Sequence, residues 1–90
     1  MLMDDIHYVE ALADYVNIYL ENSRHTILST MKAIESKLPE RDFVRVHRSY
    51  IVRIDKIVEI EDNTIILHGN KMIPVSRSYK ENLMKHLRML

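Results

Sequence analysis

The chain has 90 residues, with 13 Lys or Arg and 13 Asp or Glu, so its formal net charge is zero. This length allows roughly one domain with one modest core, and 47% apolar with 29% charged residues is typical of a folded globular protein rather than a disordered one. The absence of cysteine excludes disulfide frameworks and thiolate metal sites, and no apolar run approaches the roughly 20 residues of a membrane helix. We therefore expect a single soluble, cytoplasmic domain over residues 1–90.

The charges are unevenly distributed along the chain. Residues 1–40 contain seven acidic and three basic side chains, whereas residues 41–90 contain six acidic and ten basic ones. The halves therefore carry about −4 and +4, and a basic surface can bind a polyanion even when the whole molecule is neutral. The alternative interpretation is that these charges pair with one another on a solvated surface.

The first part of the chain predicts an antiparallel meander of three strands. Residues 6–10 and 15–20 are rich in aromatic and β-branched side chains and are joined by residues 12–14. A polar turn follows, and residues 25–28 favour a third strand.

A short helix is predicted next. Met31, Ile34 and Leu38 fall at helical spacing, and Ser29 or Thr30 can cap the helix. Because a proline follows Leu38 and disfavours helical geometry in the residue before it, the helix should end there.

Four further apolar segments predict strands. An apolar strand pattern begins at residues 43–46, and residues 56–60 and 64–67 flank a polar turn in the manner of a hairpin. The turn at residues 68–70 holds the only glycine in the chain and leads into a strand over residues 71–75. Its proline, at position 74, has no N–H to donate to a sheet, so this strand should end there or lie at an edge.

The last segment predicts an amphipathic helix. Ser76 or Ser78 can cap it, and Ser78 with Glu81 fits a capping box. Its apolar face comprises Tyr79, Leu83, Met84, Leu87 and Leu90. The predicted fold class is therefore mostly β, with small antiparallel sheets, one short middle helix and one C-terminal helix.

The segment at residues 43–52 combines an apolar strand with a polar cluster before it returns to an apolar run. The cluster offers an imidazole, a guanidinium and a hydroxyl at His47, Arg48 and Ser49. An arginine such as Arg48 or Arg77 can donate two parallel hydrogen bonds to the O6 and N7 of guanine, and Asn17 could pair with adenine in the same way. These residue types therefore favour nucleic-acid binding.

Several separate motifs carry a family resemblance. The run F-V-R-V-H-R-S-Y-I-V at residues 43–52 is preceded by Y-V-E-A at 8–11 and D-Y-V at 14–16, and it is followed by I-P-V-S-R-S-Y at 73–79. Together, in this order and over nearly the whole chain, they resemble the LytTR family of bacterial DNA-binding domains. The resemblance implies that loops, rather than a recognition helix, enter successive major grooves of promoter repeats. It also implies the output end of a two-component response regulator, with a covalently attached receiver domain.

Carried over by position, the resemblance places DNA contacts at residues 14–17, at residues 47–49 and at Arg77. Many family members have Asn at position 53, where this chain has Arg53, whose added charge is compatible with a phosphate contact. With the hydroxyl and ammonium groups suited to phosphate, the candidate DNA-binding residues are Asp14, Tyr15, Asn17, His47, Arg48, Ser49, Arg53, Ser76, Arg77 and Lys80. The expected partner is double-stranded DNA, with a second copy possible on the DNA and no membrane, metal or cofactor.

Each assignment has a structural alternative. The serines before the last helix can be caps alone, His47 can fix its own loop by an internal hydrogen bond, and Asn17 can simply face water. Tyr50 and Tyr79 can belong to the core, and Arg45 can be the exposed side of a strand. For the whole chain, the alternatives are a protein-interaction module and, less favoured, an RNA-binding domain. The histidines lack metal-site spacing and one glycine cannot form a phosphate-binding loop, so we expect no enzyme.

Overall fold

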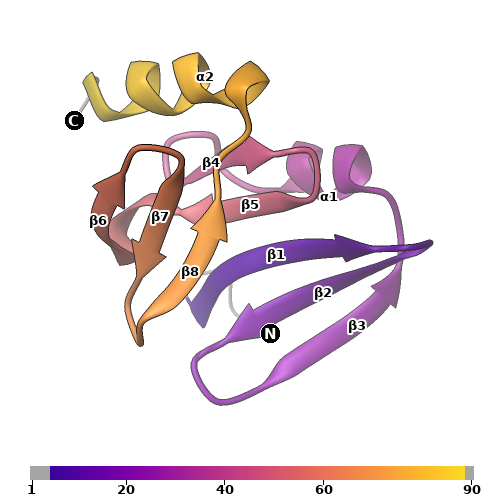
Figure 1. The fold of residues 1–90 in the computed structure, drawn as a ribbon. Coiled ribbons are helices and arrows are strands. Elements are labelled where there is room, and N and C mark those ends of the chain that lie inside the picture. The colour runs from indigo at the N-terminus through magenta and orange to yellow at the C-terminus, as the bar shows by residue number, and fades with distance from the viewer. Residues whose placement is uncertain (1–4, 89–90) are drawn as a thin grey trace.

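The computed structural model describes residues 5–88, which contain eight β-strands and two α-helices arranged in two antiparallel sheets (Figure 1). The predicted fold class is confirmed. Neither α-helix within these residues combines the length and apolarity that a membrane crossing requires.

The larger sheet has five strands in the order β3-β2-β1-β5-β4. Its strands are β1 (Ile6–Leu12), β2 (Tyr15–Leu20), β3 (Arg24–Leu28), β4 (Phe43–His47) and β5 (Tyr50–Arg53). The first three form the predicted meander, and the β4–β5 hairpin then joins the sheet because β5 pairs antiparallel with β1. This pairing brings the 43–52 segment alongside the first strand of the chain.

The smaller sheet is a three-stranded meander in the order β6-β7-β8. A short 3-10 helix (Ile54–Lys56) leads into it, and its strands are β6 (Ile57–Glu61), β7 (Thr64–Leu67) and β8 (Lys71–Pro74). The predicted turn at residues 68–70 is confirmed, because Gly69 and Asn70 have positive φ values of 87° and 64°. Pro74 ends β8, which is an edge strand, as its missing N–H required.

Helix α1 (Met31–Lys37) forms where helical spacing predicted it. The Thr30 hydroxyl accepts a hydrogen bond from the Ala33 N–H at 3.1 Å, so Thr30 is the N-cap, and Leu38 ends the helix in an extended conformation before the proline.

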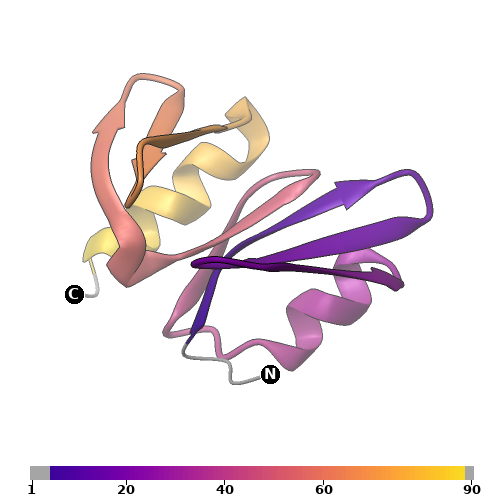
Figure 2. The same cartoon turned by 90° about the horizontal axis from the view of Figure 1, so that it is seen from below.

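The two faces of the five-stranded sheet are covered by different elements. On one face α1 completes a core, made of Ile6, Val9, Val16, Ile18, Met31, Ile34, Phe43 and Ile51. On the other, the smaller sheet and α2 (Arg77–Arg88) complete a second core, made of Tyr8, Val44, Val46, Val52, Ile54, Ile65, Leu67, Ile73, Val75 and Leu83. Figure 2 shows the two helices on opposite sides of this sheet. The sheet therefore separates two half-cores and leaves its strand ends free.

Two details of the last helix differ from the prediction. The helix begins at Arg77, so Ser76 is the residue before it, whereas Ser78 lies inside the first turn and does not form the predicted capping box. Leu83 is buried and Leu87 packs against the core, but Met84 is 41% exposed and lies off the apolar face. Leu90 lies outside the described residues.

Candidate nucleic-acid interface

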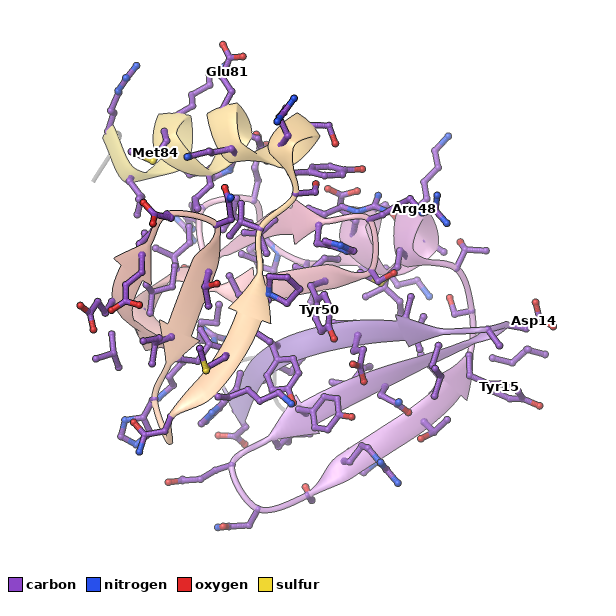
Figure 3. The ribbon with its side chains drawn as sticks, viewed as in Figure 1. Asp14, Tyr15, Arg48, Tyr50, Glu81 and Met84 are labelled. Atoms are coloured by element: carbon purple, nitrogen blue, oxygen red, sulfur yellow. The ribbon has the colours of Figure 1, made fainter. Side chains whose placement is uncertain are left out.

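Three segments far apart in sequence meet at one edge of the molecule. The Ala11 N–H donates to the Ser49 carbonyl at 2.9 Å, which places the β4–β5 turn beside the end of β1. The Ser76 N–H donates to the Val46 carbonyl at 2.9 Å, which places the entry into α2 beside the same turn. Figure 3 shows Asp14, Tyr15 and Arg48 on this side of the molecule. We call this surface the interface edge; it comprises residues 13–15, 47–49 and 76–80.

The first segment of the interface edge is the tight turn between β1 and β2. Leu12 pairs with Tyr15, so Ala13 and Asp14 alone form the turn. Ala13 has φ 56°, a left-handed conformation that costs an L-residue about 1 kcal/mol. Asp14 and Tyr15 are exposed there, as a contact with a ligand in solution requires.

The β4–β5 turn is held by the guanidinium group of Arg45. Arg45 Nη2 donates to the Arg48 carbonyl at 2.7 Å and its Nε donates to the His47 carbonyl at 3.4 Å. The same group forms an ion pair with Glu35 of α1 at 3.2 Å and lies 5.2 Å from the ring centre of Tyr79 in α2. Arg45 is therefore not simply the exposed side of a strand, because it fixes the turn that presents Arg48.

His47 also holds this turn, and it keeps one nitrogen available. Its Nδ1 accepts a hydrogen bond from the Ser49 N–H at 3.0 Å. In the neutral ring the proton must then be on Nε2, which can donate to another acceptor. The two interpretations of His47, loop fixation and donation to DNA, are therefore compatible with each other.

A group of tyrosines around Glu10 packs next to the β4–β5 turn, which Tyr50 directly follows. Tyr19 and Tyr50 each donate their hydroxyl to the Glu10 carboxylate, at 3.0 Å and 2.7 Å, and the Tyr8 ring stacks on Tyr19 with 4.3 Å between ring centres. The hydrogen bond to Glu10, together with partial burial, raises the pKa of Tyr50 to about 12. Burial raises the pKa of Tyr8 as well. These tyrosines are packed and hydrogen-bonded, so they do not form an open stacking platform for single-stranded bases.

The cationic groups of the interface edge are exposed. Arg48 lies in the β4–β5 turn, and Arg77 and Lys80 lie in the first turn of α2. The ion pair found among residues 5–88 joins Arg45 to Glu35, so carboxylates of that part of the chain do not engage these three cations. Ser76 and Ser78 have their hydroxyl oxygens 3.3 Å apart beside them. The edge thus combines free cations with hydroxyl groups, a combination suited to phosphate and guanine.

Two predicted DNA-binding residues lie inside the molecule instead. Arg53 is only 5% exposed, its Nε donates to the Ile6 carbonyl at 2.7 Å, and its guanidinium stacks 4.6 Å from the ring centre of Phe43. Asn17 is also 5% exposed, and its Oδ1 accepts from the Thr26 hydroxyl at 2.6 Å. Neither side chain can reach DNA from these positions, so we remove both from the candidate interface.

Sequence reasoning also missed two residues that position the interface edge. Arg45 was assigned to solvent, although its place three residues before Arg48 on a hairpin puts it within reach of the turn carbonyls. Glu10 lies in the predicted strand on the same face as Tyr8, and a carboxylate in an aromatic row was a sign of a buried polar network.

Comparisons with known proteins identify the family to which the chain is similar. The family model described as LytTr DNA-binding domain matches residues 1–88. The chain is 40% identical over 89 residues to Sensory transduction protein LytT of Bacillus subtilis (strain 168), covering 92% of this chain and 36% of that protein. It is 37% identical over 82 residues to Transcriptional regulatory protein YpdB of Escherichia coli (strain K12), covering 84% of this chain and 34% of that protein.

A solved structure is similar as well. It is the LytTr DNA-binding domain of a Bacillus cereus protein described as a methyl-accepting/DNA response regulator, and it superimposes with a TM-score of 0.88 at 27% identity. The match covers 97% of this chain and 84% of that chain. By contrast, the chain spans about a third of the length of the curated relatives, 36% and 34% in the two cases above.

Proposed function

The chain belongs to the LytTr DNA-binding domain family, and from this premise we propose that it binds specific double-stranded DNA through its interface edge. The observation that carries the proposal is the meeting of two distant segments, the β4–β5 turn with Arg48 and the start of α2 with Arg77 and Lys80, whose cationic side chains are exposed. An exposed cation without a carboxylate partner is available to a polyanion, whereas a paired one is not.

Each group at the edge has a distinct role in this proposal. Arg48 and Arg77 donate to the O6 and N7 of guanine in the major groove and carry the sequence preference. Ser49, Ser76 and Lys80 contact phosphate oxygens and fix the orientation on the duplex. His47 adds an Nε2–H donor, since its Nδ1 already accepts from Ser49.

In this proposal no helix lies along the groove, because the contacts come from the strand turns and from the first turn of α2. Successive major grooves on one side of B-DNA are about 34 Å apart, and the longest dimension of the domain is 31 Å. The whole domain, rather than the interface edge alone, is therefore about as long as one helical repeat, and a domain that lies along the duplex can reach two adjacent grooves. The duplex would be read at two adjacent grooves by one domain.

The longer protein is also part of the proposal. Because the chain spans about a third of its curated relatives, we place it as the output domain of a two-component response regulator, attached to a receiver domain and acting in the cytoplasm. Its targets would be promoter repeats, and a second copy would occupy the second repeat. Transcription would then respond to how well two copies bind together.

Removal of either guanine-reading arginine tests the proposal. We first select a preferred site from random duplexes with the wild-type chain, and then measure binding of Arg48→Ala and Arg77→Ala to that site by titration. Each variant should lose about 1 to 3 kcal/mol of specific binding, roughly 5- to 150-fold in Kd, with an unchanged melting temperature.

The matched control is Arg24→Ala, which removes an exposed arginine from β3, outside the interface edge. It should bind like the wild type. Equal losses in all three variants would mean that the arginines act only through overall charge, and a parallel loss of thermal stability would assign Arg48 and Arg77 to the fold.

The salt dependence of binding tests the assignment of Lys80. Each neutralised phosphate contributes about −0.9 to the slope of log K against log salt, so Lys80→Ala should make this slope shallower by about one unit. The loss of affinity should be similar on specific and random duplexes, because a phosphate contact carries no sequence information. A binding constant that barely changes with salt would contradict phosphate contacts at the edge. It would favour the alternative function, in which the edge is a hydrophobic interface with another protein.

A further inference from the structure

A row of apolar side chains is exposed at the tip of the three-stranded meander. Leu12 pairs with Tyr15 across the turn, and Tyr15 pairs with Leu28 of β3. Directly paired residues lie on the same face with Cβ atoms about 5 Å apart, so the three side chains form a continuous row. They are 63%, 51% and 74% exposed. Single exposed apolar residues are ordinary, whereas a contiguous row at a binding surface indicates a contact.

The neighbouring row of the same face has the opposite character. One step inward, Glu10 pairs with Asn17 and Asn17 pairs with Thr26, and hydrogen bonds within the protein occupy their side chains. The face therefore changes from a satisfied polar row to an unpartnered apolar row at the tip. Neither half-core of the domain reaches it, because Leu12, Tyr15 and Leu28 belong to neither cluster.

The position of this row relates it to the proposed DNA contacts. The Ala11 N–H is bonded to the Ser49 carbonyl, so Leu12 lies about one strand residue, roughly 3.3 Å, beyond the β4–β5 turn that carries Arg48. The turn at residues 13–14 lies beyond Leu28, the last paired residue of β3, so the tip itself is a two-stranded ribbon. Two strands about 4.8 Å apart fit a major groove about 12 Å wide, but they do not fit a minor groove of about 6 Å. The hairpin tip can therefore enter the major groove beside Arg48.

Within that groove, one base carries an apolar group. Thymine presents its C5-methyl there, whereas the other base edges and the phosphates present donors, acceptors and charge. We infer, on the basis of the proposed function, that Leu12 and Tyr15 at the hairpin tip contact thymine C5-methyl groups and make the domain select thymine next to the guanine bound by Arg48. Since base pairs rise about 3.4 Å along each strand, these thymines lie within about three base pairs of that guanine.

The test removes single methyl groups from the DNA. In the site selected for the wild-type chain, each thymine is replaced in turn by deoxyuridine, which differs by the C5-methyl alone. Wild-type binding should weaken about fourfold at one or more thymines within three base pairs of the Arg48 guanine, the effect of one buried methyl group. Leu12→Ser, which leaves no methyl group at this position, should bind the thymine and uracil forms of the position that Leu12 contacts equally.

The matched control is Met72→Ser, which changes an apolar strand residue of nearly equal exposure, 61%, in the smaller sheet. It should retain the fourfold difference. Equal binding of thymine and uracil sites by the wild type would overturn the inference while leaving the proposed function intact. A Leu12→Ser effect confined to DNA with two repeats would overturn it in favour of contact with a second copy. A wild-type chain without any preferred duplex would overturn the proposed function and this inference with it.

Discussion

The β4–β5 hairpin has an arginine at each end, and the two have opposite surroundings. At the turn, the backbone carbonyl of Arg48 accepts a hydrogen bond from Arg45, and the side chain of Arg48 is exposed to solvent. At the other end, Arg53 is buried against Phe43 and bonded to the Ile6 carbonyl. The comparison shows that residue type alone does not define an interface in this domain. A distant strand that supplies a partner turns a cationic residue into part of the core.

The largest expected effect is a lower free energy of unfolding in Arg53→Ala, which tests the difference between the two ends of the hairpin. The substitution removes a charged hydrogen bond and the stack on Phe43, and it leaves the Ile6 carbonyl buried without that donor. Together these losses should lower the free energy of unfolding by about 3 kcal/mol. Urea denaturation measures it, with Arg48→Ala as comparison, which should change stability by less than about 0.5 kcal/mol. Similar stabilities of the two variants would contradict the difference between the two ends.

A smaller effect concerns Tyr50, which follows the turn and donates to Glu10. Because this bond favours the neutral phenol and raises its pKa to about 12, its contribution to stability is complete below the ordinary value of 10.0 and is lost as pH rises toward 12. Tyr50→Phe should cost about 1 kcal/mol at neutral pH and make the fall in stability between pH 10 and 12 shallower.

Thermal melts across this pH range measure the effect, with Tyr15→Phe as control because Tyr15 is exposed at the β1–β2 turn. The control should keep the wild-type profile. If Tyr50→Phe also kept the wild-type dependence of stability on pH, the hydrogen bond from Tyr50 to Glu10 would not stabilise the hairpin near its turn.

Local patterns in the sequence were sufficient for most elements of the fold. Segments rich in aromatic and β-branched residues gave the strands, and the spacing of Met31 and Ile34 with Thr30 as cap gave α1, because these signals involve residues close together in the chain. The exposed candidates of the interface edge were also identified, since Arg48 lies in a two-residue turn where a long charged side chain has no neighbour to bury it.

The errors arose where a partner lies far away in sequence. Arg53 and its acceptor Ile6 are 47 positions apart, and they meet only because β5 pairs with β1. Asn17 similarly depends on Thr26 of the adjacent strand. A polar residue within an apolar strand predicts burial with a partner as readily as it predicts exposure, and strand order decides between the two.

The smallest expected effect lies at the start of α2, where the interface edge meets the second helix. Ser78 is the second residue of this helix and its hydroxyl lies 3.3 Å from that of Ser76, so Ser78→Ala removes no N-cap and should change stability by less than about 0.5 kcal/mol. Thr30→Ala provides the contrast, because loss of the bond to the Ala33 N–H should cost about 1 kcal/mol. Differential scanning calorimetry resolves the two. A Ser78→Ala loss as large as that of Thr30→Ala would mean that Ser78 supports the fold. The start of α2, beside the β4–β5 turn, would then resemble the buried end of that hairpin more than its exposed end.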